Sequence, residues 1–244
     1  MIIAFSGKQG SGKDLAGKIV QYLIYNNHRK NSGFNEIPFH QYDDGFPRET
    51  SWTIHKFADK LKDCVCLILG CTRKQLEDRE YKETELGEEW WFNNIVPENG
   101  FGTKLINWDR DLKPQKMTPR LLLQLLGTEC GRHIIHPNIW VNATMVDYRD
   151  TKILNRDSFK SKQVDIDNWI FTDVRFPNEC EAIKKHNGIV IRLQRLGNGI
   201  LEQVEHLSET ALDFYKFNYI IYNNSTIEYL IEQIKLILIK EKII

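Results

Sequence analysis

The chain has 244 residues, enough for one sizeable α/β domain or two small ones. Hydrophobic residues make up 41% of it and charged residues 27%, as in an ordinary globular protein. With 33 basic and 33 acidic side chains there is no overall basic charge to attract a nucleic acid, so any anionic ligand must be held by local geometry.

Cysteine usage and hydropathy indicate a reducing environment away from membranes. The five cysteines are odd in number and include no C-x-x-C pair, so we expect neither a disulfide framework nor a zinc site. No apolar stretch approaches the roughly 20 residues that span a bilayer. The sequence begins at once with an apolar strand pattern, which leaves no room for a signal peptide. We therefore expect a cytoplasmic protein, in the host cytoplasm if it is viral.

A phosphate-loop motif opens the chain. An apolar strand pattern over residues 2–5 leads into a glycine-rich segment, and a helical pattern continues to about residue 25. This segment fits G-x-x-x-x-G-K in the strand-to-helix context that the motif requires. Its glycines allow backbone N–H groups to point at phosphate oxygens, and the helix adds its positive end. We predict an ATP site formed by Gly7, Lys8, Gln9, Gly10, Ser11, Gly12, Lys13 and Asp14.

Asp14 stands where the motif usually has Ser or Thr. A carboxylate oxygen suits a hard cation, which makes Asp14 a candidate magnesium ligand. A carboxylate is also favourable at a helix N-terminus, and the two interpretations are compatible. Against direct metal ligation, a carboxylate beside phosphates also repels them.

Residues 26–117 combine predicted helix and strand with two long irregular segments. Residues 26–51 are polar and turn-rich, and predict an insertion. Residues 53–57 predict a short strand, and 58–69 a helix that ends at Gly70. From 83 to 117 the periodicity is lost, which is typical of a long functional loop.

Thr118 and Pro119 predict the start of a helix that runs to about Arg132. Arg120 and Gln124 lie four residues apart on it and so face the same way. An arginine can clamp a phosphate bidentately, and a glutamine can read a base edge. The same spacing also occurs on the solvated face of any amphipathic helix, so that alternative stays open.

A further helix is predicted near residues 139–148, and a buried strand over 168–172 that ends at Asp173. Ligands of parallel α/β sheets bind outside the carboxyl ends of the strands. Asp173 thus resembles the aspartate that holds magnesium in P-loop proteins, and Arg175 could reach the transferred phosphate. The alternative is that Asp173 caps the next helix and Arg175 pairs with a surface acid.

The remainder alternates between helix and strand. We predict a helix over 177–187, strands over 188–193 and 217–222, and a final helix that Thr226 caps. Strands that alternate with helices predict a parallel sheet covered on both faces. The predicted fold is therefore α/β, with a P-loop NTPase-like parallel sheet flanked by helices.

Arg192 and Arg195 precede a loop that contains two glycines. We interpret residues 192–208 as a mobile lid that carries arginines to the reacting phosphates. Arg192 is accordingly a predicted ATP ligand.

Together these motifs resemble the phage-type deoxynucleoside monophosphate kinases, a family of P-loop kinases. The resemblance rests on residues 5–14, 57–62, 118–129 and 172–179, and residues 206–209 are similar to the family's sequence after its lid. The Thr-Pro-Arg start at 118 and the Thr-Asp-Val-Arg-Phe-Pro-Asn-Glu stretch at 172 are the most specific of these. The family has Gly-Lys-Asp in its phosphate loop, as phosphomevalonate kinases do, which accounts for Asp14.

The resemblance implies a nucleoside-monophosphate-kinase-like fold with a lid. It implies transfer of the ATP γ-phosphoryl group to a deoxynucleoside 5′-monophosphate, with Mg²⁺ as cofactor. Catalytic roles fall to Lys13, Asp173 and Arg175, with Asp14 and Asp173 as metal ligands. The predicted acceptor-binding residues are Lys62, Arg120, Gln124, Arg132, Trp140 and Arg175.

We expect a single domain over 1–244, with an acceptor-binding or inserted region at about 53–150 and the lid at about 192–208. Residues 26–51 and 83–117 do not match the family, which leaves the base preference open. The large tryptophan-bearing loops could hold the acceptor or a second subunit, so a homodimer is one expectation. The alternative functions are a phosphomevalonate-kinase-like enzyme and an ATP-binding protein without transfer. Balanced charge argues against a nucleic-acid-directed ATPase.

Overall fold

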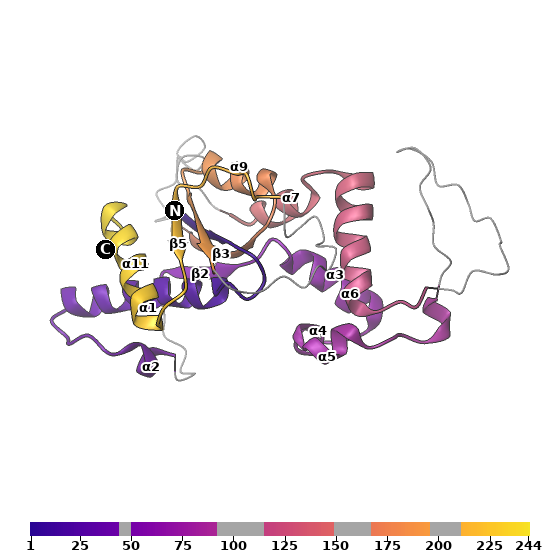
Figure 1. Cartoon of the computed structure of the whole chain (residues 1–244), viewed down its shortest axis with the longest axis horizontal. Coiled ribbons are helices and arrows are strands. Elements are labelled where there is room, and N and C mark those ends of the chain that lie inside the picture. The colour runs from indigo at the N-terminus through magenta and orange to yellow at the C-terminus, as the bar shows by residue number, and fades with distance from the viewer. Residues whose placement is uncertain (44–49, 92–114, 149–166, 196–210) are drawn as a thin grey trace, which may run out of the picture. The chain divides into compact units, whose positions relative to one another are not determined.

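The structure is a computed structural model, and it describes residues 1–43, 50–91, 115–148, 167–195 and 211–244 (Figure 1). The chain divides into two compact units. Unit 1 comprises Met1–Phe57 and Val141–Ile244, and unit 2 comprises Ala58–Trp140. The expectation of a single domain with an inserted region stays a prediction.

Unit 1 is built on a five-stranded sheet in the order β2-β3-β1-β4-β5, and all of its strand pairs are parallel. The strands are β1 (Ile2–Ser6), β2 (Trp52–His55), β3 (Asn168–Val174), β4 (Ile189–Gln194) and β5 (Tyr219–Tyr222). The three central strands consist almost entirely of buried residues, because a parallel sheet is covered on both faces. The predicted P-loop NTPase-like α/β fold is confirmed.

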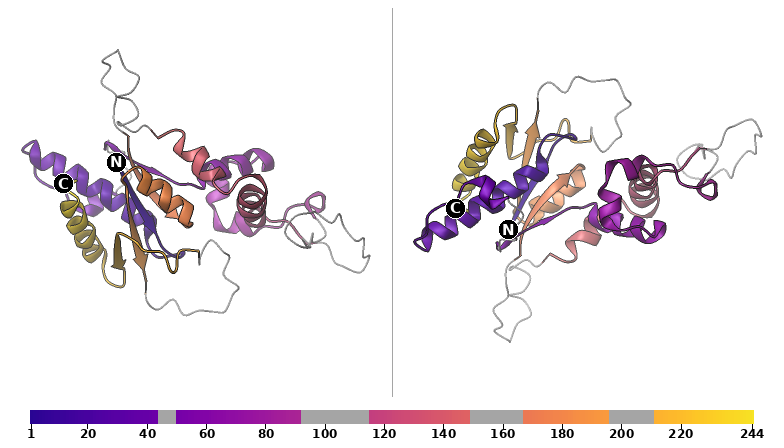
Figure 2. Two further views of the ribbon diagram at one scale, coloured as in Figure 1. Left: turned by 90° about the horizontal axis from the view of Figure 1, so that it is seen from above. Right: turned by 90° about the horizontal axis from the view of Figure 1, so that it is seen from below.

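Helices cover both faces of this sheet (Figure 2). Two of them, α1 (Lys13–Asn31) and α11 (Ile227–Lys240), pack on one face, and α9 (Pro177–Lys185) packs on the other. Successive residues of β1 point to opposite faces. Ile3 and Phe5 therefore join the core cluster of α1 and α11, whereas Ile2 and Ala4 join that of α9. Val141 of α7 (Ile139–Met145) belongs to the α9 side.

The insertion predicted from residue 26 onward is wrong in its first part, because α1 continues to Asn31. Asn26 is buried in this helix, and its side-chain amide donates to the Ile37 carbonyl at 2.8 Å and accepts from the Ile37 N–H at 3.1 Å. A side-chain amide that both donates and accepts a hydrogen bond is tolerated inside a helix. The short helix α2 (Phe39–Tyr42) then follows, and residues 44–49 lie outside the described residues.

Unit 2 is helical in the part that the structure describes. Its elements are α3 (Asp59–Leu69), α4 (Arg73–Glu77), α5 (Arg79–Glu83), the 3₁₀ helix η1 (Glu88–Trp90), α6 (Pro119–Gln124) and the π-helical η2 (Leu125–Ile135). Leu61, Val65, Leu76 and Trp140 form its core. The predicted helix end at Gly70 is confirmed, with φ of 64° at that glycine.

The helix predicted from Thr118 is also confirmed. The Thr118 hydroxyl accepts the N–H of Leu121 at 3.1 Å, and Pro119 is the first helical residue. Further along the same helix, a Cβ on Gly127 would lie 2.7 Å from Leu61 Cδ2, so the glycine allows close packing. The N-cap predicted for the last helix is confirmed too, since Thr226 accepts from Tyr229 N–H at 3.3 Å.

Residues 92–114 of the predicted loop at 83–117, and residues 196–210 of the predicted lid, lie outside the described residues. Within the described ranges, no helix has the length and apolar composition that a membrane span requires.

Gly188 offers a test of the packing between α9 and the sheet. A Cβ at this position would lie 2.6 Å from Ile183 Cγ2 and 2.9 Å from the Ile2 carbonyl oxygen. Because the backbone of a central strand cannot move aside, we expect Gly188→Ala to lower the free energy of unfolding by about 1–3 kcal/mol in urea titrations. The control is Lys185→Ala on the exposed side of α9, which should change it by less than about 0.5 kcal/mol. Equal stabilities of the two variants would contradict this account.

Candidate active site

The turn from β1 into α1 forms the candidate phosphate site. Gly10 and Gly12 have φ values of 77° and 96°, which glycine adopts without steric cost. A Cβ on Gly12 would also lie 2.7 Å from Nδ2 of Asn223. The backbone therefore winds tightly into the N-terminus of α1, where N–H groups and the helix dipole favour an anion.

Lys13, the first residue of α1, folds back over this turn. Its Nζ donates to the carbonyl oxygens of Gly7 at 2.6 Å and Lys8 at 2.7 Å, and lies 3.4 Å from Ser11 Oγ. These acceptors are neutral, and a charged phosphate oxygen is a stronger acceptor. The ammonium group is thus held at the loop and can exchange to a phosphate.

Asp14 follows Lys13 and contacts two other strands. Its Oδ1 lies 2.7 Å from Nζ of Lys56, which comes directly after β2, and it accepts the Thr172 hydroxyl of β3 at 2.8 Å. Burial would raise the pKa of Asp14, but the hydrogen bonds from Lys56 and Thr172 and the charges of Lys56 and Lys13 hold that pKa below its ordinary value. Asp14 is therefore ionised at neutral pH.

Asp173 lies next to Thr172 in β3. The register of β3 against β1 shifts between Phe171 and Val174, so the strict alternation of side chains between the two faces is interrupted at Thr172 and Asp173. The Asp173 Oδ1 accepts the backbone N–H of Phe57 at 2.9 Å, which ties the segment after β2 to β3. The carboxylate thus has a structural contact in addition to its predicted metal role.

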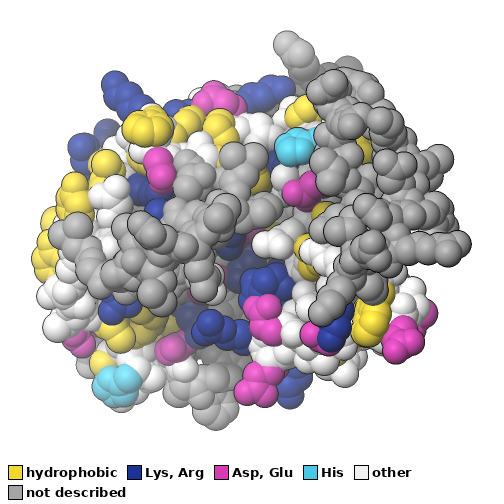
Figure 3. Space-filling model, turned by 45° about the vertical axis from the view of Figure 1, so that its right-hand side comes forward, with side chains coloured by type: hydrophobic (Ala, Val, Ile, Leu, Met, Phe, Trp, Pro, Cys, Tyr) yellow, Lys and Arg dark blue, Asp and Glu magenta, His cyan; other side chains and the backbone are white. Residues whose placement is uncertain are grey.

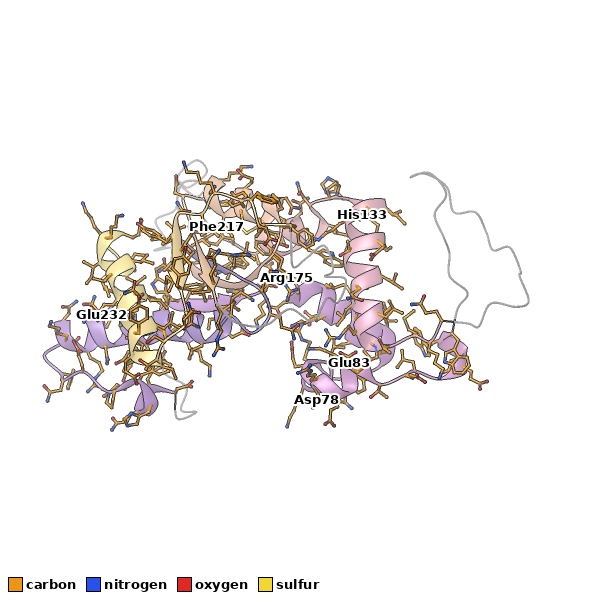
Figure 4. The ribbon with its side chains drawn as sticks, viewed as in Figure 1. Asp78, Glu83, His133, Arg175, Phe217 and Glu232 are labelled. Carbon is orange, nitrogen blue, oxygen red and sulfur yellow. The ribbon has the colours of Figure 1, made fainter. Side chains whose placement is uncertain are left out.

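Arg175 follows β3 and is half-buried (Figure 4). The buried carboxylate of Glu179 accepts the N–H groups of Arg175 at 2.7 Å and Phe176 at 3.1 Å. Glu179, rather than the alternative Asp173, satisfies these N–H groups at the start of α9. It fixes the backbone that carries Arg175.

The donor atoms here fit a magnesium ion. Magnesium takes hard oxygen ligands, commonly one or two protein carboxylates with phosphate and water oxygens as the rest. Asp14, Thr172 and Asp173 offer oxygens of this kind. Across the described residues there is no group of three or more His, Cys, Asp or Glu side chains that could hold a metal.

The side chain of Arg192 is more deeply buried than that of a mobile lid residue would be. It is in β4, in register with Ser6 of β1, and 8% of its side chain is exposed. It donates to Ser6 Oγ at 3.0 Å and to Asp213 Oδ1 at 3.2 Å. These contacts brace the end of β1 below the phosphate loop, and the ATP contact of Arg192 stays a prediction.

Asn223 contacts the phosphate loop from the end of the edge strand β5. It follows β5, where its backbone N–H donates to the Gln194 carbonyl at 2.7 Å. Its side-chain Nδ2 donates to the Ser11 carbonyl at 2.9 Å. No motif in the sequence pointed to this residue or to Lys56.

Unit 2 carries a second group of charged side chains, which we call the basic cluster: Lys62, Arg73, Lys82 and Arg120. Lys62 pairs with Glu77 at 2.6 Å, and 14% of its side chain is exposed. Lys82 lies 3.6 Å from the same carboxylate. Burial lowers the pKa of Lys82, the nearby charges of Lys62 and Arg120 lower it further, and Glu77 opposes this.

Within this cluster, Arg120 of α6 pairs with Glu83, which ends α5. Glu83 is labelled in Figure 4. Arg73 bridges Asp59 and Asp63, each at 2.8 Å. Basic and acidic side chains lie side by side on the face drawn in Figure 3. The side chains of the basic cluster are therefore held by carboxylates that an anionic ligand can replace.

The other residues predicted to bind the acceptor are also in unit 2. Gln124 is half-buried at the end of α6, and Arg132 is half-buried in η2. Trp140 is 7% exposed within the core, and its indole N–H donates to the Gly127 carbonyl at 2.7 Å. This gives Trp140 a structural role, and its contact with an acceptor stays a prediction.

Comparison with known proteins bears on both units. A sequence model of the family described as deoxynucleotide monophosphate kinase matches residues 15–234. A putative deoxynucleotide monophosphate kinase of Acanthamoeba polyphaga mimivirus is 32% identical over 243 residues, which cover 96% of this chain and 94% of that protein. The deoxynucleoside-5′-monophosphate kinase of Escherichia phage T5 is 25% identical over 216 residues, covering 77% of this chain and 73% of the phage protein. The chain therefore belongs to the deoxynucleotide monophosphate kinase family.

Proposed function

We propose that the protein transfers the γ-phosphoryl group of ATP to a deoxynucleoside 5′-monophosphate, giving ADP and the deoxynucleoside diphosphate. The observation that carries this proposal is the glycine-rich turn with Lys13 and Asp14, packed against the end of β3. Family membership supports the acceptor class, since the phage T5 relative is named a deoxynucleoside-5′-monophosphate kinase. Phosphoryl transfer needs positioned cations more than covalent help from the protein, and both units supply them.

On the donor side, the backbone N–H groups of residues 7–13 would bind the ATP phosphates. Lys13 would exchange its carbonyl partners for β- and γ-phosphate oxygens. Asp14, Thr172 and Asp173 would hold magnesium, which neutralises charge on the phosphates. Arg175 would reach the transferred group.

On the acceptor side, unit 2 would bind the monophosphate through its basic cluster. Arg120 can bind a phosphate bidentately once its ion pair with Glu83 breaks. Lys62 lies in the same cluster. Gln124, one helical turn after Arg120, would read the base, with Arg132 as a further acceptor contact. The phosphomevalonate alternative is not favoured, because both relatives are named as nucleotide kinases.

The proposal also covers the cellular compartment and the oligomeric state. Relatives from a phage and a giant virus support a role in the cytoplasm of a host cell. The homodimer expected from the large loops stays a prediction.

A panel of acceptors tests the proposed function. The protein is incubated with ATP, Mg²⁺ and one acceptor at a time, and ADP is followed by a coupled assay. The acceptors are the four common deoxynucleoside monophosphates, their ribose counterparts and phosphomevalonate. We expect turnover with at least one deoxynucleotide and none with phosphomevalonate. The reverse pattern would overturn the proposal.

Lys13→Ala tests the phosphate loop. Removing a cation that contacts charge in the transition state should reduce kcat by about a hundredfold or more. Lys18→Ala is the control, because Lys18 lies on the same helix and pairs with Asp43 at 2.7 Å. Near-normal kcat for Lys13→Ala would show that the loop does not bind the reacting phosphates.

Asp173→Asn separates the two roles of this carboxylate. The amide keeps an oxygen for the Phe57 N–H but loses the charge that a metal needs. We expect thermal stability close to that of the wild type, with turnover reduced by about a hundredfold or more. Asp173→Ala should lose both turnover and stability. If Asp173→Asn kept wild-type turnover, the proposed metal role of Asp173 would be wrong.

Arg120→Ala tests the acceptor side. Loss of a charge-assisted contact should raise the acceptor KM by about tenfold or more, with a smaller effect on the KM for ATP. The matched control is Lys116→Ala, which breaks the 2.7 Å pair with Glu85 in the same unit. An effect of Arg120→Ala confined to ATP would refute its placement.

A further inference from the structure

Lys56 meets the phosphate loop because of the sheet order. It follows β2, which pairs in parallel with β3, and β3 pairs in parallel with β1. The carboxyl ends of these strands therefore lie at the same edge of the sheet. At this edge the Lys56 ammonium lies 2.7 Å from Asp14 Oδ1, which also accepts the Thr172 hydroxyl at 2.8 Å.

We propose that Lys56 is a positioning residue for the donor nucleotide: it neutralises Asp14, so that the loop can bind phosphates although its helix begins with a carboxylate. This inference rests on the proposed function, in which the loop binds ATP.

The charges at the loop carry the argument. Asp14 stands directly after Lys13, so its negative charge offsets the cation that the loop offers to phosphates. The Lys56 ammonium restores the balance, because its 2.7 Å contact places a positive charge on the same carboxylate. Without Lys56, the Asp14 carboxylate beside the bound phosphates would lose the positive charge that contacts it directly.

The exposure of the pair indicates that it matters for binding more than for folding. The Asp14 side chain is 72% exposed and that of Lys56 is 29% exposed. Exposed ion pairs add little to stability, since water screens them. The pair can therefore be broken in a folded protein, and its effect on the bound anion can be measured.

Magnesium should change how much Lys56 matters. A divalent cation that arrives with ATP supplies Asp14 with a second positive partner. With metal-free nucleotide, no divalent cation adds to the contact that Lys56 makes with this carboxylate. The inference therefore predicts that loss of Lys56 weakens metal-free nucleotide more than the magnesium complex.

The experiment measures dissociation constants of ATP by titration calorimetry, in EDTA and in excess Mg²⁺. Lys56→Met should weaken ATP binding in EDTA by about tenfold, and clearly less in Mg²⁺. Lys56→Arg keeps the charge and should bind within about twofold of the wild type. The double variant Asp14→Asn with Lys56→Met removes both charges, and should restore the metal-free affinity to within about twofold.

Lys18→Met is the matched control. It breaks a pair with Asp43 that has the same 2.7 Å distance and starts from the same helix, but lies outside the loop. This variant should bind ATP as the wild type does under both conditions. Asp14→Asn alone should tighten metal-free binding, which keeps the test available if Lys56→Met does not fold.

Three results would overturn the inference. The first is unchanged metal-free affinity in Lys56→Met, and the second is a loss that the Asp14→Asn substitution does not rescue. The third is an equal loss with and without Mg²⁺, which would indicate a merely structural role. A wild-type protein that binds no ATP under either condition would overturn the proposed function as well, so the two failures are distinguishable.

Discussion

The candidate phosphate site depends on one constraint, which is the parallel pairing of strands in the order β2-β3-β1. It brings the glycine-rich turn, Lys56 and the Thr172-Asp173 pair to one edge of the sheet, although these segments lie far apart in the chain. Gly17 sets the distance between α1 and this edge, since a Cβ there would lie 2.6 Å from Thr172 Cγ2. Close approach of the helix is what allows Asp14 to accept the Thr172 hydroxyl.

In both units, basic side chains contact oxygen atoms of the protein itself. In unit 1 the Lys13 ammonium rests on loop carbonyls and Lys56 on Asp14, and in unit 2 Arg120 rests on Glu83. Such partners keep long side chains in place without a ligand, and a doubly charged phosphate can displace those of Lys13 and Arg120. The acid in the phosphate loop fits this arrangement, because it has a cationic partner of its own.

Local patterns predicted much of this molecule. The strand, glycine-rich loop and helix at the start, and the Thr118-Pro119 helix start, follow from chain chemistry over a few residues. The polarity of Asn26 suggests a turn, but its amide forms hydrogen bonds with the distant backbone of Ile37. The glycine-containing segment after Arg192 suggests a lid residue, but in-register pairing with Ser6 turns Arg192 inward. The spacing of residues along the sequence does not identify Lys56 and Asn223 as residues of the site. Asn223 contacts a loop 212 residues away, and strand order alone brings such residues together.

In the proposed function, the loop and the end of β3 hold ATP for transfer to a nucleotide, and not for hydrolysis. The most direct measurement supplies ATP labelled in its γ-phosphate together with Mg²⁺ and one accepted deoxynucleoside monophosphate, and separates the products. We expect the label to appear in the deoxynucleoside diphosphate in the same amount as the ADP that forms. Label released as inorganic phosphate, with no labelled diphosphate, would contradict the proposed function.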